Sequence, residues 1–487
     1  MKWNISRRDF LKKSSLAAAT TLACARGEET AENGRNTDVI KEPAREIPVA
    51  GDFDICVVGG SCTGVFAAVA AARLGARAAV IENNGFFGGV AAASLVNIWH
   101  SPYDTVEEKQ IIAGLSMEMI ERLEPRGAVS RGQSGYSFFR LNTEELKIEL
   151  DLLVKEAGVR PFLHTLFVSP VMREGKLEAV VIEDKSGRRA IRASYFIDAT
   201  GDGDLIARMG LPFYKSGNIQ PPTTCAILRG LERIRKKYPD FNLEKVIFDP
   251  QYPLALKKGF AWGAPVPGSL DEYMLAGTRV FGADCSVAEQ LTQAEMDGRR
   301  QVRAICDILR ENFIHDQFQP LVTLPAKIGI RETRHARCLH QLTEQEVLYG
   351  KRFPDAIANG SYRVDIHLAD REGLIFRYLD GTEVLAGIEG NREEGRWREE
   401  LPENPTFYQI PYSSLVPRDS KNVLVAGRIL DADPGAFGAV RVMINCNQTG
   451  QAAGTAACLA LDSKTTFAQV DPQKLREVLS QQGAIII

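Results

Sequence analysis

Apolar residues near the start of the chain fall into two short runs that flank a longer alanine-rich segment. The first run, 54–58, leads into a glycine-rich loop at 59–64, and the second run, 77–81, ends at Glu82. Short apolar runs are typical of buried strands, and the segment between them has the length and composition of a helix. The pattern therefore predicts a strand–loop–helix–strand unit, with Gly75 at the C-terminal end of the helix.

The loop of this unit carries the residues that a dinucleotide requires. Glycines let the backbone approach a pyrophosphate, and a helix N-terminus offers it unpaired N–H groups. Glu82 follows at the distance expected for an acid that accepts ribose hydroxyls. Ser61 replaces the middle glycine of the usual fingerprint, and its hydroxyl is small enough to bond a phosphate oxygen. The predicted pyrophosphate-binding residues are Gly59, Gly60, Ser61, Cys62, Thr63 and Gly64. The alternative is a tight turn in another kind of α/β protein.

The patterning further along predicts an interrupted α/β architecture. Residues 160–195 alternate short β-runs with turns, which predicts a β-meander. Residues 211–404 show no regularly spaced sheet, whereas strands and helices alternate again from residue 405. We therefore expect residues 51–210 and 405–487 to build one Rossmann-like domain. A mixed α+β substrate or cap domain is inserted between them.

Two later helices are predicted with distinct ends and faces. Residues 142–158 form an amphipathic helix with Thr143 as its N-cap and Gly158 as its C-cap. Residues 440–461 form a long helix whose alanines and glycines permit close backbone packing. If its N-terminus faces a bound cofactor, the helix dipole stabilises negative charge there. The alternative is a close-packed core helix without a ligand.

The N-terminal residues have the features of an export signal. Residues 6–12 read Ser-Arg-Arg-Asp-Phe-Leu-Lys, and an apolar stretch at 16–23 follows. This order is that of a twin-arginine signal, a route used by folded proteins that already hold a cofactor. Residues 21–24 also resemble a lipobox, which would make Cys24 a lipid anchor. We expect a signal peptide at 1–25, a flexible linker at 26–50, and a periplasmic or lipid-anchored mature protein.

Composition narrows the range of partners. The chain has 487 residues, 25% of them charged, and a net charge of −3, which does not favour nucleic acid as a partner. It has no apolar stretch of the ~20 residues that a membrane span needs. Its nine cysteines include no pair at C-x-x-C spacing, so we predict no metal site and no redox-active disulfide.

Four segments of the chain together resemble the FAD-dependent oxidoreductases with a glutathione-reductase-like fold: 57–89, 197–204, 329–334 and 422–454. The resemblance implies FAD as the cofactor, with its pyrophosphate at the glycine loop and its adenosine ribose at Glu82. It also implies that Val168 lies near the adenine. The adenosine side would be lined by Ala199, Thr200, Gly201 and Asp202, and the ribityl chain and flavin would be approached by Gly427 and Arg428. Asn83, Gly88, Gly89 and Arg441, in the same stretches, complete the expected FAD-binding set.

Histidines and arginines supply the candidates for chemistry. Arg331 and His335 are close in sequence and suit the binding of an anionic or polyhydroxylated substrate and the removal of a proton. The alternative is a solvated helix face with an internal ion pair. Asp365 and His367 alternate in a predicted strand and share a face, as an oriented base or as a structural histidine. His100 is placed to reach the flavin. We predict Arg331, His335 and His367 as the catalytic residues.

These features predict an exported FAD-dependent dehydrogenase. It would transfer hydride between flavin and a small organic substrate such as a carbohydrate or a hydroxy acid, with an electron acceptor that the sequence does not identify. No second glycine fingerprint follows, so we expect no separate NAD(P)H domain. Two alternatives remain open. One is a lyase or hydrolase that acts on sugars or polysaccharides and holds FAD structurally, and the other is a flavin-holding binding protein without turnover.

Overall fold

The computed structural model describes residues 39–487, apart from 134–136, 258, 370–372 and 388–391. The predicted signal peptide, the lipobox cysteine Cys24 and part of the predicted linker lie outside the described residues. Residues 47–487 pack into one unit, to which the following description refers.

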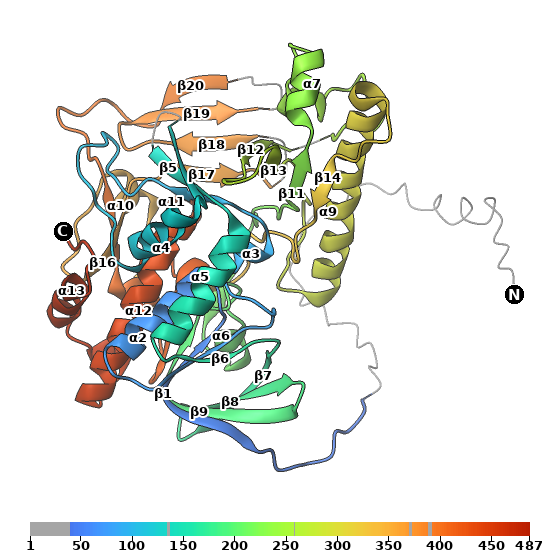
Figure 1. The fold of residues 1–487 in the computed structure, drawn as a ribbon. Coiled ribbons are helices and arrows are strands. Elements are labelled where there is room, and N and C mark those ends of the chain that lie inside the picture. The colour runs from blue at the N-terminus through green and yellow to red at the C-terminus, as the bar shows by residue number, and fades with distance from the viewer. Residues whose placement is uncertain (1–38, 134–136, 258, 370–372, 388–391) are drawn as a thin grey trace, which may run out of the picture. The chain divides into compact units, whose positions relative to one another are not determined.

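A mostly parallel sheet forms the base of this unit (Figure 1). Its strands follow the order β6-β2-β1-β9-β8-β7, and β22 also pairs with β9. The pairs β6–β2, β2–β1, β1–β9 and β9–β22 are parallel, whereas β7, β8 and the first half of β9 form an antiparallel meander. The strands are β1 (Val49–Val58), β2 (Ala78–Ile81), β6 (Arg160–Phe162), β7 (Leu166–Arg173), β8 (Lys176–Asp184), β9 (Gly187–Asp198) and β22 (Val423–Val425). The predicted strand–loop–helix–strand unit and the β-meander are confirmed, and the last part of the chain returns to the first sheet.

Two parallel helices, α2 (Cys62–Arg73) and α12 (Met443–Ser463), pack backbone to backbone beside this sheet (Figure 1). A Cβ atom added at Gly450 would overlap the carbonyl oxygen of Thr63, and one at Gly454 would overlap that of Ala67. The Cys458 thiol continues the series by donating to the carbonyl of Ala71. Contacts thus repeat every four residues in the same direction along both helices. The predicted close packing of the small-residue helix is confirmed.

The predicted single helix at 440–461 is wrong at its start. The structure has two helices there, α11 (Pro434–Val440) and α12, separated by Arg441 and by Val442 in an extended conformation. Asp433 caps α11 by accepting from the N–H of Ala436 at 2.8 Å. No side chain caps α12, so its first N–H groups stay available at the helix N-terminus.

The predicted amphipathic helix is α5 (Thr143–Glu156), with one correction at its start. Asn142, not Thr143, is the N-cap, because its side-chain oxygen accepts from the N–H groups of two residues in the first turn. Asparagine is a stronger N-cap than threonine. The two glycines expected at helix ends, Gly75 and Gly158, have the left-handed φ values of +95° and +71°.

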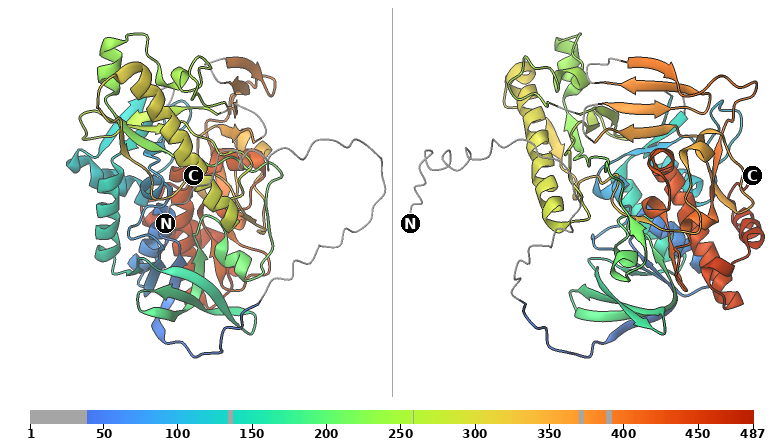
Figure 2. Two further views of the ribbon diagram at one scale, coloured as in Figure 1. Left: turned by 90° about the vertical axis from the view of Figure 1, so that its right-hand side faces the viewer. Right: turned by 180° about the vertical axis from the view of Figure 1, so that it is seen from behind.

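The middle of the chain forms two four-stranded antiparallel sheets that the sequence pattern did not reveal. Their orders are β12-β13-β11-β14 and β17-β18-β19-β20. Helix α9 (Ala288–Leu309) packs its apolar face on the first of them. Figures 1 and 2 show both sheets at the end of the unit opposite the β7–β9 meander. Most of these strands are only four or five residues long, too short to stand out as periodic patterns. The exact limits of an inserted domain remain a prediction.

The middle strands are β11 (Ala226–Arg229), β12 (Trp262–Pro265), β13 (Glu272–Ala276), β14 (Leu321–Thr323), β17 (Val364–His367), β18 (Leu374–Arg377), β19 (Thr382–Ala386) and β20 (Arg392–Arg396). The remaining strands are β3 (Ile98–His100), β4 (Val129–Gln133), β5 (Ser137–Leu141), β10 (Phe213–Tyr214), β15 (His335–Ala336), β16 (Ala356–Gly360) and β21 (Tyr408–Pro411). The remaining helices are α3 (Val90–Ala93), α4 (Leu115–Leu123), α6 (Asp204–Arg208), α7 (Leu231–Lys237), α8 (Leu243–Val246), α10 (Glu344–Leu348) and α13 (Pro472–Gln481).

Two properties of the described residues bear on partners. No helix among them is long and apolar enough to cross a membrane. The cysteines in this part of the chain are all free and buried, and no cluster of three or more metal-ligating side chains occurs there. Most of these cysteines are small side chains of the interior, while Cys62, Cys225 and Cys446 also line the cavity described below.

Replacing Gly454 with valine should lower the free energy of unfolding by about 2–3 kcal/mol, because the added atoms must push α12 away from α2. Urea denaturation followed by circular dichroism measures the change. The control is Gly217→Ala, where nothing lies within 4 Å of an added Cβ and the change should stay within about 0.5 kcal/mol. Equal stability of the two variants would contradict the helix contact.

Candidate active site

A cavity of about 450 Å³ lies between the N-termini of α2 and α12 and the strands of the middle segment. This volume is within the range of small-molecule sites. One group of lining residues comes from loops that follow the strands of the main sheet: Ser61, Cys62, Thr63, Gly88, Gly89, Ala199, Thr200, Gly201, Gly427 and Arg428. A second group comes from the middle segment and includes Thr223, Cys225, Phe260, Trp262, Arg331, Tyr362, Arg363, Asp365, His367, Leu374 and Phe376. His100, Arg441 and Asn447 line it as well.

The glycine loop after β1 positions the start of α2 at this cavity. Gly59 has φ +107°, and a Cβ there would overlap the carbonyl oxygen of Ala199. A Cβ at Gly64 would overlap the carbonyl oxygen of Gly59. These two glycines therefore serve the turn and the helix–strand contact. Ser61 is the N-cap of α2, and its Oγ accepts from the N–H of Gly64 at 3.3 Å, which leaves its hydroxyl hydrogen for a ligand.

Glu82 lies behind the loop rather than in the cavity lining. Its carboxylate accepts from the N–H of Gly60 at 2.8 Å and from the backbone and side-chain N–H groups of Asn84 at 2.8 and 2.7 Å. A carboxylate offers about four acceptor positions, so one remains for a ribose hydroxyl. Glu82 thus joins the loop after β1 to the loop after β2.

Asp198 holds the third loop, 199–201, in place. It is fully buried, and its carboxylate accepts from the N–H and hydroxyl of Thr200 and from the N–H groups of Leu205 and Ile206, all within 3.0 Å. Burial raises its pKa to about 6, although these hydrogen bonds oppose the shift. The sequence pattern predicted the loop but not the buried carboxylate beneath it.

Among the lining residues, Arg428 and Asn447 each carry a buried donor atom without a hydrogen-bond partner in the described part of the chain. Arg428 bonds Asp202 through Nη2 at 3.1 Å, while its buried Nη1 has no hydrogen-bond partner among the described residues. The side-chain nitrogen of Asn447, in the first turns of α12, is also buried and has no hydrogen-bond partner among the described residues. Both are hydrogen-bond donors, so a ligand that offers acceptor atoms would satisfy them.

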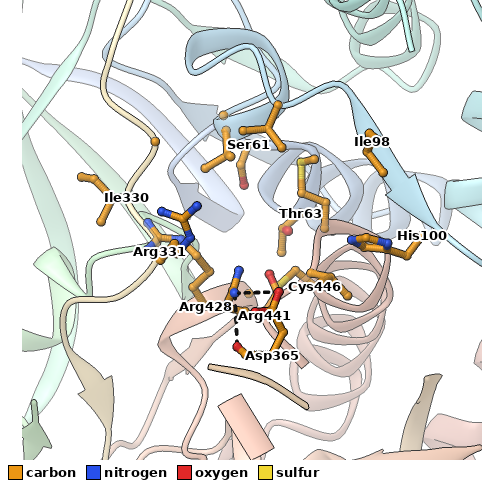
Figure 3. A pocket seen from close by; sticks show the side chains of 18 of the residues that line it. Ser61, Thr63, Ile98, His100, Ile330, Arg331, Asp365, Arg428, Arg441 and Cys446 are labelled. Atoms are coloured by element: carbon orange, nitrogen blue, oxygen red, sulfur yellow. Dashed lines mark hydrogen bonds and ion pairs between the residues drawn. The ribbon is translucent and has the colours of Figure 1, made fainter. Parts of the chain in front are cut away.

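Arg331, from the middle segment, also lines the cavity, and Figure 3 shows it together with Arg428 and Arg441. Arg331 uses Nη1 to donate to the carbonyl of Pro221 at 2.6 Å and to Thr223 Oγ1 at 2.7 Å. Arg279, just behind the wall, donates to the same hydroxyl at 2.8 Å. Burial and the charges of Arg279 and Arg441 lower the pKa of Arg331 well below its usual value. Burial likewise lowers the pKa of Arg279 to about 10.

Asp365 and His367 share one face of β17, as the alternation predicted. Asp365 Oδ2 accepts from the hydroxyl of Tyr362 at 2.8 Å and pairs with Arg441 at 3.3 Å. Its buried Oδ1 makes no hydrogen bond and lies 3.5 Å from His367 Nε2. His367 Nδ1 accepts from Arg279 Nε at 3.3 Å. Burial and three neighbouring arginines lower the pKa of His367 well below its usual value, so the imidazole is neutral.

The prediction that His335 acts at the site does not agree with its position. The ring is 1% exposed and is not among the cavity-lining residues of the described chain. Its nitrogens contact Glu332 Oε1 at 3.1 Å and the carbonyl of Leu430 at 3.3 Å. The segment before it is not helical, and Arg331 reaches the cavity whereas His335 contacts the buried interior. His335 ties the middle segment to the loop after β22.

Other predicted residues also lie away from the cavity lining. Gly59, Gly60 and Gly64 lie inside the glycine loop. Asp202 is connected to the cavity through its bond with the lining residue Arg428. The carbonyl of Val168 accepts from Arg208 at 2.6 Å. Asn83 accepts from Lys327 at 2.6 Å. Whether any of them contacts a cofactor stays a prediction. The sequence analysis also missed Arg279, Arg363 and Asn447, because only tertiary packing brings them to the site.

The sequence matches one protein-family model over most of its length. The model for FAD-dependent oxidoreductases matches residues 54–479, nearly the whole described chain. The chain belongs to the FAD-dependent oxidoreductase family. Its cofactor is FAD, and the mixed α/β fold with a Rossmann-like FAD-binding part agrees with the sequence prediction.

Solved structures are similar only at a distance. A geranylgeranyl bacteriochlorophyll reductase-like protein from Thermoplasma acidophilum is 12% identical with a TM-score of 0.42, over 89% of this chain and 84% of that one. A flavoprotein/dehydrogenase from Cytophaga hutchinsonii is 12% identical with a TM-score of 0.43, over 88% and 83%. A p-nitrophenol 4-monooxygenase from Pseudomonas putida is 9% identical with a TM-score of 0.40, over 89% and 88%. Similarity at this level says nothing about activity. No curated protein matches the sequence significantly.

The residues of this FAD-dependent oxidoreductase fit its cofactor. The N-terminus of α2 supplies N–H groups for a pyrophosphate. Arg428 and Asn447 present donors that the protein itself leaves without acceptors. The uncapped start of α12 contributes a second positive helix end, because Val442, Met443 and Cys446 also line the cavity.

Acid should destabilise this oxidoreductase through His367. The imidazole stays neutral in the folded state and takes up a proton in the unfolded chain below about pH 6.5, so stability is complete above that pH and falls below it. From pH 7.5 to 5.0 the wild type should lose about 2 kcal/mol more than His367→Gln, measured by urea denaturation at both pH values. The exposed control His315→Asn should follow the wild type. Parallel losses in wild type and His367→Gln would show that this histidine is not buried as described.

Proposed function

We propose that this FAD-dependent oxidoreductase is an exported dehydrogenase, in which a small organic substrate binds beside the flavin in the described cavity. The observation that carries the proposal is that one cavity is lined both by the loops of the Rossmann-like part and by the polar residues Arg331, Asp365 and His367. The inserted middle segment supplies the substrate wall, and the parts on either side of it supply the cofactor wall.

The chain would hold FAD through a defined set of groups. The N–H groups at the start of α2 and the hydroxyl of Ser61 bond the pyrophosphate, and the remaining acceptor position of Glu82 takes a ribose hydroxyl. Arg428 and Asn447 donate to oxygens of the cofactor, since each carries a buried donor without a partner. The first turn of α12 would stabilise negative charge on a flavin ring bound beside it.

Hydride acceptance or donation is the chemistry that FAD supplies when bound. The part left to the protein is the proton. When a hydroxyl group is oxidised, its proton must leave, and Asp365 Oδ1 is a buried acceptor without a hydrogen bond in the wall of the cavity. Tyr362 and Arg441 hold the other oxygen of this carboxylate, which fixes its orientation. We therefore assign Asp365 as the base.

His367, predicted as a catalytic residue, has a different role in this proposal. Its Nδ1 is occupied by Arg279, and its low pKa makes it a poor base. The remaining ring nitrogen faces Asp365. His367 is therefore a positioning residue that keeps the Asp365 carboxylate directed at the cavity, and Arg331 binds the substrate rather than moving a proton.

Export is proposed on the sequence alone. The twin-arginine pattern at residues 6–12 favours transport of the folded, FAD-loaded protein, followed by release into the periplasm or anchoring through Cys24. In either place the electrons leave to an external acceptor.

Anaerobic mixing with hydroxy acids, carbohydrates and amines tests the reaction. One of these substrates should bleach the flavin absorbance, and Asp365→Asn should slow that bleaching by about 10²- to 10⁴-fold, because the base is lost while the shape is kept. FAD content should stay the same in both proteins. The exposed Asp52→Asn variant is the control and should bleach at the wild-type rate.

Two results would overturn the proposal. Conversion of a sugar with the flavin spectrum unchanged would favour a lyase or hydrolase with structural FAD. Binding without any conversion across the whole screen would favour a flavin-holding binding protein.

A further inference from the structure

We propose that the substrate is an organic anion. Its carboxylate binds Arg331, and its apolar body packs against the apolar residues that line the rest of the cavity. This inference rests on the proposed function for the position of the flavin, and it names the substrate class of the same cavity. It selects the hydroxy acid over the carbohydrate among the substrates that the sequence suggested.

Charge in the cavity wall is the first observation. Arg331, Arg363, Arg428 and Arg441 line it, while Asp365 is the sole carboxylate among the lining residues of the described chain. His367 is neutral and adds no charge. Asp365 pairs with Arg441 and Asp202 pairs with Arg428, so the positive charge of Arg331 has no carboxylate partner among the described residues. Buried charge without a counter-ion is costly, so an anion is the ligand that this wall stabilises most.

FAD accounts for only part of this excess. Its phosphates belong at the start of α2, where the helix N-terminus and the free donor of Arg428 face the cavity. Arg331 lies in the middle-segment wall, outside the loops that follow the main sheet. Its positive charge therefore remains for a second anion.

Arg331 presents the geometry that a carboxylate requires. Its Nη1 is held by the carbonyl of Pro221 and by Thr223 Oγ1, so the guanidinium plane cannot rotate freely. No hydrogen bond in the described chain uses its Nη2 or Nε. A fixed guanidinium with free donors binds a planar carboxylate through two hydrogen bonds. Arg279, buried behind it and with Nη2 unpartnered, adds positive charge at the same place.

A large part of the remaining lining is apolar. The residues involved are Val96, Ile98, Phe260, Trp262, Leu374 and Phe376. A sugar would need a partner for each of its hydroxyls, and Thr223, the nearest hydroxyl to Arg331, already accepts from two arginines and donates to the carbonyl of Thr278. An aryl or alkyl group fits this surface and loses no hydrogen bonds when it leaves water. The substrate is thus an apolar hydroxy acid, with its hydroxyl at Asp365.

Binding of two small probes to the FAD-loaded protein tests the inference. Phenylacetate carries the apolar body and the carboxylate but has no hydroxyl to oxidise, and phenylacetamide lacks only the charge. Phenylacetate should perturb the flavin absorbance and bind about 10- to 100-fold more tightly than the amide. The comparison uses the wild-type protein, so it does not depend on a variant that folds.

Variants then locate the carboxylate. Arg331→Met should reduce the affinity for phenylacetate to that for the amide, with the affinity for the amide unchanged. Arg331→Lys should recover only part of it, because lysine keeps the charge but not the paired donors. The exposed control Arg300→Met, on α9, should match the wild type.

The outcomes separate the inference from the proposed function. Equal affinity for phenylacetate and phenylacetamide would contradict the inference. Flavin reduction by sugars but not by hydroxy acids would also contradict it. Neither result would contradict the proposed dehydrogenase activity. Tight, Arg331-dependent binding of phenylacetate in a protein whose flavin no substrate reduces would support the inference and overturn the dehydrogenase.

Discussion

The parallel contact between α2 and α12 is the constraint on which the rest of the site depends. Glycines at 450 and 454 let the two helix backbones approach so closely that any side chain would separate them. Because the helices run in the same direction, both positive ends open into one cavity. The first helix comes from the start of the described chain and the second from its end. The cavity therefore exists only when the two parts of the Rossmann-like fold are joined.

This arrangement concentrates positive charge in one cavity. Two helix ends, Arg331, Arg428 and Arg441 lie at this cavity, where Asp365 is the one lining carboxylate among the residues that the structure describes. Burial is the main cause that lowers the pKa values of Arg331 and His367, and the neighbouring arginines add to it. Cofactor phosphates and a substrate carboxylate would offset this excess positive charge, which the protein's own carboxylates do not neutralise. Stability, cofactor binding and substrate choice then depend on the same charges.

Local patterns in the sequence predicted the local structure well. The unit from β1 to Glu82, the β-meander and the pairing of Asp365 with His367 on one face all follow from spacings of a few residues. The errors arose where distant segments decide the outcome. The middle sheets are built from strands too short to show a period, and His335 pairs with Glu332 and Leu430 instead of facing the cavity. Arg279 acquires its role only through contact with His367, 88 residues away. No local pattern contains that contact.

The FAD content of the purified protein tests the central claim most directly. Protein isolated from a host that exports or retains it in folded form should be yellow and should release about one FAD per chain on heat denaturation, as one pyrophosphate site at α2 requires. Colourless protein that stays colourless after incubation with FAD, although it is folded by circular dichroism, would contradict the account.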